Sequence, residues 1–303
     1  MVPKAVSGLF FYIRIMENTI GTQSTVKRVA IQGGAGAFHE IAALHYFGTE
    51  NVEIVPTLTF KDLFQSLKHQ HADYGIMAIE NMVAGSILPN YNLLRTSNMK
   101  IIGEIYLRII QNLVALPGQT IDQINEVYSH PMAILQCQTF FEEYPHIRLV
   151  DSVDTALSAK EIADKQLKGV GAISSSQAAE KYGLDVMYSS IESNKMNYTR
   201  FLILTDKDEQ IEFAEPVNKS SLQFALAHEI GSLAKILSIF SYFNINLTKI
   251  QSLPIVGQEW EYFFYVDVEF SDYKIYQHAL DSVKPFTSAL EILGEYHKGK
   301  SIV

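Results

Sequence analysis

Short apolar segments alternate with segments of helical periodicity over the first two thirds of the chain. The strand-like segments are VAI at 29–31, VEIVP at 52–56, YGIMAI at 74–79, EVYSHP at 126–131, RLVDS at 148–152 and GVGAI at 169–173. Apolar residues at helical spacing follow most of them. Repeated strand–helix units predict mostly parallel sheets with helices on both faces, and two such α/β lobes are expected.

The pattern changes after Thr205. The polar segment DKDEQIEFAEPVNK at 206–219 predicts a linker, and strand, helix, strand, strand, helix and strand patterns follow it. This β-α-β-β-α-β order is that of the ferredoxin-like fold. We therefore expect a tail at 1–26, a bilobal domain at 27–205, a linker at 206–218 and a second domain at 219–303.

Composition limits the classes of function. The 303 residues carry a net charge of −9, with 48% hydrophobic and 19% charged residues, which is typical of a globular protein. The negative charge argues against a nucleic-acid partner. The single cysteine, Cys137, rules out an internal disulfide framework or a multi-cysteine metal site and fits a reducing cytoplasm.

The N-terminal segment GLFFYI at 8–13 is the one apolar run outside the predicted domains. Six residues are too few to span a bilayer, which takes about 20, and Arg14 and Glu17 follow at once. We expect no membrane partner, and a loosely attached tail.

The turn after the first strand contains Gly34 and Gly36. It resembles a dinucleotide fingerprint, but His39 stands at the third glycine position and no acidic residue ends the next strand, which disfavours a nucleotide. The turn either presents backbone N–H groups to a carboxylate or only packs tightly.

Two polar pairs follow strand-like segments. Glu80-Asn81 follows YGIMAI, and Ser129-His130 follows EVY, so both pairs are expected at the carboxyl edge where open α/β sheets bind ligands. Pro131 makes His130 an equally good helix N-cap, and Gln136 lies on the helix behind it. The histidines show no spacing that predicts a metal site.

Four segments together resemble the motifs of prephenate dehydratase. They are GGAGAFHEIAA at 33–43, MAIENMVAGSI at 77–87, SHPMAILQC at 129–137 and NYTRF at 197–201. IGSLAKIL at 230–237 and NINLTKIQSLP at 244–254 resemble the ACT regulatory domain that follows in that family. The resemblance covers residues 27–300. It implies a two-lobed domain like the periplasmic binding proteins, an active site in the cleft, no cofactor, and conversion of prephenate to phenylpyruvate.

The resemblance also implies site residues. The catalytic set is Thr199, Glu80, Asn81, Ser129 and Gln136, and the substrate contacts are Gly34, Gly36, Ala37, Phe38, Ser86, His130, Asn197, Arg200 and Phe201. Thr199 is expected to donate a proton or hydrogen bond to the leaving hydroxyl. Arg200 either pairs a carboxylate or faces away from Thr199, since side chains alternate along a strand. Glu80, if desolvation keeps it protonated, and His130 are the alternative acids.

Feedback control by phenylalanine is a further implication, with homodimers or homotetramers formed through the ACT domains. The implied phenylalanine contacts are Ile230, Gly231, Ser232, Leu233, Asn246, Leu247, Gln251, Ser252 and Pro254. The family's Glu-Ser-Arg-Pro motif reads Gln251-Ser252-Leu253-Pro254 here, without either charge, and this weakens the expectation of strong inhibition.

Three alternatives stay open. Arogenate dehydratase acts on a substrate that carries an amine in place of the keto group. A solute-binding protein or an amino-acid sensor would use the same fold without chemistry.

Overall fold

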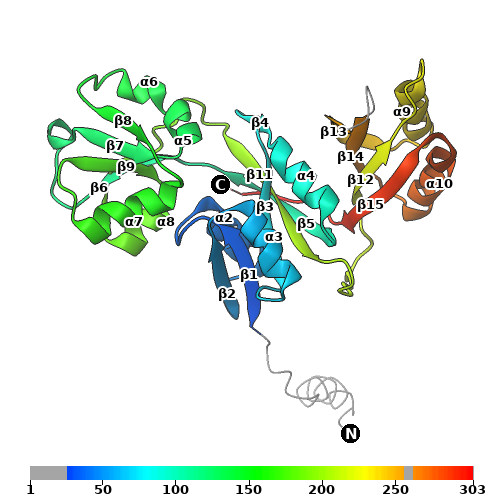
Figure 1. Cartoon of the computed structure of the whole chain (residues 1–303), viewed down its shortest axis with the longest axis horizontal. Coiled ribbons are helices and arrows are strands. Elements are labelled where there is room, and N and C mark those ends of the chain that lie inside the picture. Colours follow the sequence, from blue (N-terminus) through cyan, green and yellow to red (C-terminus); the bar gives the residue numbers. More distant parts are fainter. Residues whose placement is uncertain (1–25, 256–261, 303) are drawn as a thin grey trace, which may run out of the picture.

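Three β-sheets follow one another along the long axis of the molecule, and the sheet formed first in the sequence lies between the other two (Figure 1). The structure is a computed structural model that describes residues 26–255 and 262–302. Most of the expected tail at 1–26, including the apolar run at 8–13, lies outside the described residues.

The central sheet has the strand order β16-β5-β11-β3-β1-β2, and β4 pairs with β3. Its strands are β1 (Lys27–Gln32), β2 (Val52–Thr57), β3 (Tyr74–Asn81), β4 (Gly85–Ser86), β5 (Met99–Arg108), β11 (Tyr198–Asp206) and β16 (Ser301–Ile302). β1 is parallel to β2 and β3, whereas β11 is antiparallel to both β3 and β5. The sheet is thus more mixed than the sequence predicted, because the chain leaves this lobe after β5 and returns into β11 in the opposite direction.

Helices cover both faces of the central sheet. α2 (Phe38–Phe47) covers one face, and α3 (Phe60–Lys68) and α4 (Leu88–Thr96) cover the other. α3 begins at a capping box, in which Thr59 and Asp62 satisfy each other's backbone N–H groups. α2 and α3 agree with the sequence pattern, while α4 was not anticipated.

The second lobe has a five-stranded sheet in the order β10-β6-β9-β7-β8. Its strands are β6 (Asn112–Ala115), β7 (Glu126–Ser129), β8 (Arg148–Asp151), β9 (Val170–Ser174) and β10 (Asp185–Tyr188), and its helices are η1 (Ile121–Gln123), α5 (Pro131–Gln136), α6 (Gln138–Phe141), α7 (Thr155–Lys165) and α8 (Ser176–Tyr182). β7, β8 and β9 are parallel, and α5 and α6 cover the face opposite α7 and α8. The predicted bilobal α/β architecture is confirmed.

The C-terminal domain has an antiparallel sheet in the order β13-β14-β12-β15, with both long helices on one face. Its elements are β12 (Lys219–Ala225), α9 (Ser232–Tyr242), β13 (Asn246–Pro254), β14 (Tyr262–Glu269), α10 (Tyr273–Val283), η2 (Lys284–Phe286) and β15 (Ser288–Tyr296). This confirms the ferredoxin-like order.

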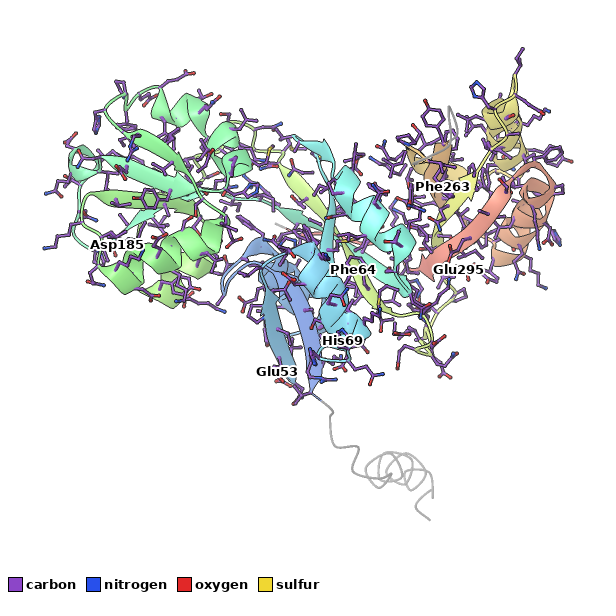
Figure 2. All side chains as sticks on the ribbon, in the orientation of Figure 1. Glu53, Phe64, His69, Asp185, Phe263 and Glu295 are labelled. Atoms are coloured by element: carbon purple, nitrogen blue, oxygen red, sulfur yellow. The ribbon has the colours of Figure 1, made fainter. Side chains whose placement is uncertain are left out.

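The other face of the C-terminal sheet packs on the central sheet. Leu253, Tyr265 and Tyr296 of the C-terminal sheet share one apolar core with residues of β3, α3 and α4. Phe64 of α3 belongs to this core, and Phe263 of β14 packs against it (Figure 2). Beyond β15 the chain returns, and β16 pairs with β5. The predicted boundary between the domains stays a prediction.

None of the helices in residues 26–255 and 262–302 combines the length and the apolar character needed to cross a membrane.

Candidate active site

A buried threonine lies between the two lobes at the start of β11. Thr199 is only 7% exposed, and its Oγ1 accepts a hydrogen bond from Asn81 Nδ2 at 2.9 Å. Asn81 is the last residue of β3, directly opposite Thr199 in the antiparallel pair. The two side chains that the sequence placed in different motifs therefore meet at the ends of neighbouring strands.

A β-bulge in β3 makes this meeting possible. Arg200 pairs with Glu80 and Phe201 with Ala78, so Ile79 is the extra residue. Strict alternation would put Asn81 on the same face as Ile79, which faces the core shared with the C-terminal domain. The extra residue shifts the phase, as bulges do, and turns Asn81 toward Thr199.

A chain of amide side chains joins this pair to the second lobe. Asn81 Nδ2 donates to Asn197 Oδ1 at 2.8 Å, and Asn197 Nδ2 donates to Gln136 Oε1 at 3.0 Å. Gln111 Nε2 also donates to Gln136 Oε1, at 3.2 Å. Gln136 belongs to α5, so the polar cluster of Thr199, Asn81, Asn197, Gln136 and Gln111 joins the two lobes.

The backbone fixes the direction of these hydrogen bonds. Asn81 Oδ1 accepts from the backbone N–H groups of Val83 and Ala84, at 2.9 and 2.8 Å, so its Nδ2 must face Thr199. The threonine oxygen is thus an acceptor, and its proton has no protein acceptor within the described residues. Gln136 Nε2 is likewise without an acceptor in the part of the chain that the structure describes, because Oε1 takes both neighbouring bonds. The cluster therefore offers two donor groups, the Thr199 hydroxyl and Gln136 Nε2, that have no acceptor among the described residues.

The cluster is uncharged. The cysteine behind it, Cys137, is fully buried, and burial raises the pKa of its thiol to about 12, so that it stays protonated at neutral pH. Among the described residues, no group of three or more histidine, cysteine, aspartate or glutamate side chains is placed to hold a metal ion.

Three predicted site residues, Arg200, Glu80 and Ser86, face away from the cluster, which for Arg200 agrees with one of its two alternatives and for the other two is a correction. Arg200 lies on the opposite face of β11, where it pairs with Glu104 and with Asp267 of the C-terminal domain. Glu80 pairs with Lys249 of β13, which also donates to Ser86 Oγ. Alternation along β11 and the bulge in β3 direct these side chains to the C-terminal domain, so neither Arg200, Glu80 nor Ser86 lines the cleft cluster.

The glycine turn is also filled by the protein itself. Gly36 N–H donates to Glu40 Oε2 at 2.5 Å, and Gly34 N–H lies 3.5 Å from Asp154 Oδ1. Gly36 O accepts from Ser175 Oγ of the second lobe at 2.6 Å. These contacts support the tight-packing interpretation of the turn, and an anion site there stays a prediction.

The remaining predicted contacts serve packing and capping. Ala37 packs against the second lobe, Phe38 packs against the core under α2, and Phe201 is buried in that core. Ser129 Oγ donates to Ile173 O at 2.8 Å, and His130 caps α5 by accepting from Met132 N–H. These contacts confirm the N-cap for His130 and leave a ligand role for Ser129 without support.

Sequence reasoning missed Gln111 and Ser174. Gln111 Oε1 and Ser174 Oγ are buried without a partner among the described residues. Gln111-Asn112 interrupts the apolar run at 104–116, and that polar pair marks where the chain crosses between the lobes.

Some of the predicted phenylalanine contacts adjoin a hollow in the C-terminal domain. Gly231 caps α9 at φ 80°, and Ser232 and Leu233 line a hollow of about 130 Å³ beside β14. Asn246, Leu247, Gln251, Ser252 and Pro254 lie on β13, and Ile230 is fully exposed. Ligand binding by these residues stays a prediction.

The fold and the cluster define a protein with a two-lobed α/β domain, a polar site between its lobes and a ferredoxin-like domain. Residues 29–209 match the family model for prephenate dehydratase. Arogenate dehydratase 2 of Petunia hybrida is 37% identical over 302 residues, which cover 94% of this chain and 75% of that protein. The chain belongs to the prephenate dehydratase family of hydro-lyases.

Solved structures have the same fold. A prephenate dehydratase of Arthrobacter aurescens in complex with L-Phe aligns with a TM-score of 0.80 and 25% identity, over 89% of this chain and 90% of that one. GqqA, described as a novel type of quorum quenching acylase, aligns with a TM-score of 0.81 and 27% identity, over 90% of this chain and 98% of that one.

Proposed function

We propose that this protein converts prephenate to phenylpyruvate, carbon dioxide and water at the Thr199 cluster. The observation that carries the proposal is the direction of one hydrogen bond. Asn81 donates to Thr199 Oγ1, so the threonine proton is left for a ligand. A positioned donor of this kind contributes about 10²–10⁴ in rate when it acts in the transition state.

The reaction needs no covalent intermediate with the protein. The bond between the ring and its carboxylate breaks, its electron pair makes the ring aromatic, and the ring C–O bond breaks. The leaving hydroxyl takes one proton, whose net source is the solvent, and becomes water. Threonine is a weak acid, so aromatisation supplies most of the drive while the hydroxyl of Thr199 stabilises the departing oxygen. Gln136 Nε2 orients the substrate, and Asn197 and Gln111 hold Gln136.

Arogenate is the second candidate substrate, and the relative from Petunia hybrida, named arogenate dehydratase 2, favours testing it. The purified protein should be given each substrate in turn, with phenylpyruvate or phenylalanine measured as product. Prephenate turnover with the higher kcat/KM supports the proposal, and turnover of arogenate alone would replace it. A protein that turns over neither is a binding protein or sensor.

We do not extend the acylase activity named for GqqA to Thr199 of this chain. A threonine nucleophile needs a base beside it. Within the described residues, no carboxylate or imidazole hydrogen-bonds to Thr199.

We assign residues 27–205 to the catalytic domain, 206–218 to a linker and 219–303 to an ACT regulatory domain that binds phenylalanine. The L-Phe complex of the Arthrobacter aurescens protein supports this assignment. β13 is an edge strand with one side unpaired in the described part of the chain, which suits a homodimer or homotetramer built through these domains. A cytoplasmic location fits the single buried cysteine.

Calorimetry with phenylalanine, run beside a turnover assay at rising phenylalanine, separates binding from control. We expect binding with inhibition that is weaker than in relatives that carry both charges, since Gln251 and Leu253 lack the charges of the family motif. The absence of binding heat would refute the pocket, whereas binding without inhibition would refute the coupling alone.

A further inference from the structure

Neighbouring residues on β3 and β11 face two different sites. Thr199 and Asn81 belong to the polar cluster, whereas Arg200 and Glu80, next to them in sequence, contact the C-terminal domain. Consecutive residues share a rigid peptide plane, so a displacement of the backbone at one residue also displaces the side chain of its neighbour. The two strands that hold the cluster are therefore also the strands that hold the C-terminal domain.

Arg200 is the more buried of the two links, with a side chain only 5% exposed. Its Nε donates to Glu104 Oε2 at 2.7 Å, its Nη1 pairs with Asp267, and its Nη2 donates to Tyr296 Oη at 3.2 Å. Burial by itself would lower the pKa of Arg200, but the charges of Asp267 and Glu104 outweigh it and raise the pKa. The guanidinium stays charged, and all three of its nitrogens are engaged.

Asp267 is ionised as well. Burial raises the pKa of its carboxyl, but the charge and hydrogen bonds of Arg200 and the hydroxyl of Ser221 outweigh burial and lower it. A buried charge that loses its partner is strongly destabilising. Any movement of β14, which carries Asp267, must therefore either carry Arg200 with it or separate the pair at high cost.

Glu80 makes the second link. Lys249 Nζ of β13 pairs with Glu80 and donates to Ser86 Oγ at 2.7 Å. Glu80 follows the bulge residue Ile79, at the place where the phase of β3 shifts to bring Asn81 to Thr199. A displacement of Glu80 therefore changes the β-bulge that orients Asn81.

We propose that Arg200 and Glu80 are positioning residues, through which Asp267 and Lys249 of the C-terminal domain set the geometry of Thr199 and Asn81. The proposal rests on the proposed function of the Thr199 cluster. It gives the C-terminal domain a direct effect on the reaction, with no ligand needed.

The test changes only the far partners. Asp267→Asn and Lys249→Met leave every residue of the cleft cluster in place. We expect each to lower kcat about tenfold with KM changed less than about twofold, because a displaced donor loses its effect in the transition state. Asp267→Glu keeps the charge and should recover part of the loss.

Tyr265→Phe is the matched control. Tyr265 Oη donates to Tyr91 O at 3.2 Å in the same buried interface, but Tyr91 lies on α4 and not on β3 or β11. This variant should lower the melting temperature and keep the wild-type kcat. The side-chain amide NMR signal of Asn81 should shift in Lys249→Met and stay in place in Tyr265→Phe.

Folded Asp267→Asn and Lys249→Met proteins with wild-type kcat would overturn the proposal, as would an equal loss of kcat in Tyr265→Phe. If Asp267→Asn does not fold, Lys249→Met decides alone, since Lys249 is partly exposed and lies on the edge strand. Thr199→Val, assayed in parallel, reports on the cluster itself. Wild-type kcat in Thr199→Val would refute the proposed function. A lower kcat in Thr199→Val, with wild-type kcat in Asp267→Asn and Lys249→Met, would refute only the positioning role.

Discussion

Thr199→Val tests the proposed reaction at its centre. The change keeps the shape of the side chain and removes the hydroxyl that the structure leaves free to donate. If that hydroxyl binds the departing oxygen in the transition state, kcat should fall while KM changes little.

The magnitude follows from the contacts of Thr199. Loss of one positioned donor to a developing charge lowers kcat by about 10²–10³, or about 2.7–4 kcal/mol. The cost to folding is smaller, because Asn81 Nδ2 keeps its bond to Asn197 Oδ1 at 2.8 Å. The free energy of unfolding should therefore fall by only about 1 kcal/mol.

Steady-state kinetics and urea denaturation of the same preparations measure the two effects separately. Thr205→Val is the matched control, since Thr205 lies on the same strand, is buried, and donates to Asp73 O at 3.0 Å, far from the cluster. It should lose similar stability and no kcat. A Thr199→Val protein with wild-type kcat, or equal kinetic losses in both variants, would show that the hydroxyl has only a structural role.

Three further predictions concern packing and pH. Leu253→Ala should lower the free energy of unfolding by about 2–4 kcal/mol in urea, since Leu253 is buried in the core between the domains; no change would contradict that packing. Gly36→Ala should lower the free energy of unfolding by about 1–3 kcal/mol and should also lower kcat. The reason is that φ is +83° and the new Cβ would lie 2.5 Å from Ala178 Cα. Gly48 has a similar φ but open space around it, so Gly48→Ala should lower the free energy of unfolding less than Gly36→Ala does. An equal decrease in both variants would refute the role of the contact between the lobes at Gly36. Burial lowers the pKa of His39 to about 3, so between about pH 6.5 and pH 3 the unfolded chain binds a proton that the folded chain does not, and stability should fall with pH by up to about 1.4 kcal/mol per unit. In denaturation curves at about pH 7 and about pH 4.5, His39→Leu should lose less unfolding free energy between the two pH values than the wild type does. An equal loss in both proteins would refute the role of His39.

The order of apolar and polar segments was enough to predict most of the architecture. Strand and helix periodicities are local properties, so the alternating units before Thr205 and the β-α-β-β-α-β series after it could be seen in the sequence. Thr199, Asn81 and Gln136 could also be selected as site candidates, Asn81 because it follows a predicted strand and all three because they lie in motifs that resemble those of the family.

The direction of individual side chains was decided by the tertiary structure. The phase of β3 changes at Ile79, and a bulge depends on the partner strand, which lies more than a hundred residues away in sequence. Arg200 was predicted to contact the substrate because it lies in the NYTRF motif. In the structure it forms an ion pair with Asp267, 67 residues later. Likewise, Ser175 Oγ reaches Gly36 O only because the two lobes pack there, whereas the contact of Glu40 with the Gly36 N–H is local. Sequence periodicity carries no information on which distant partner a polar group finds, and a buried polar group must find one.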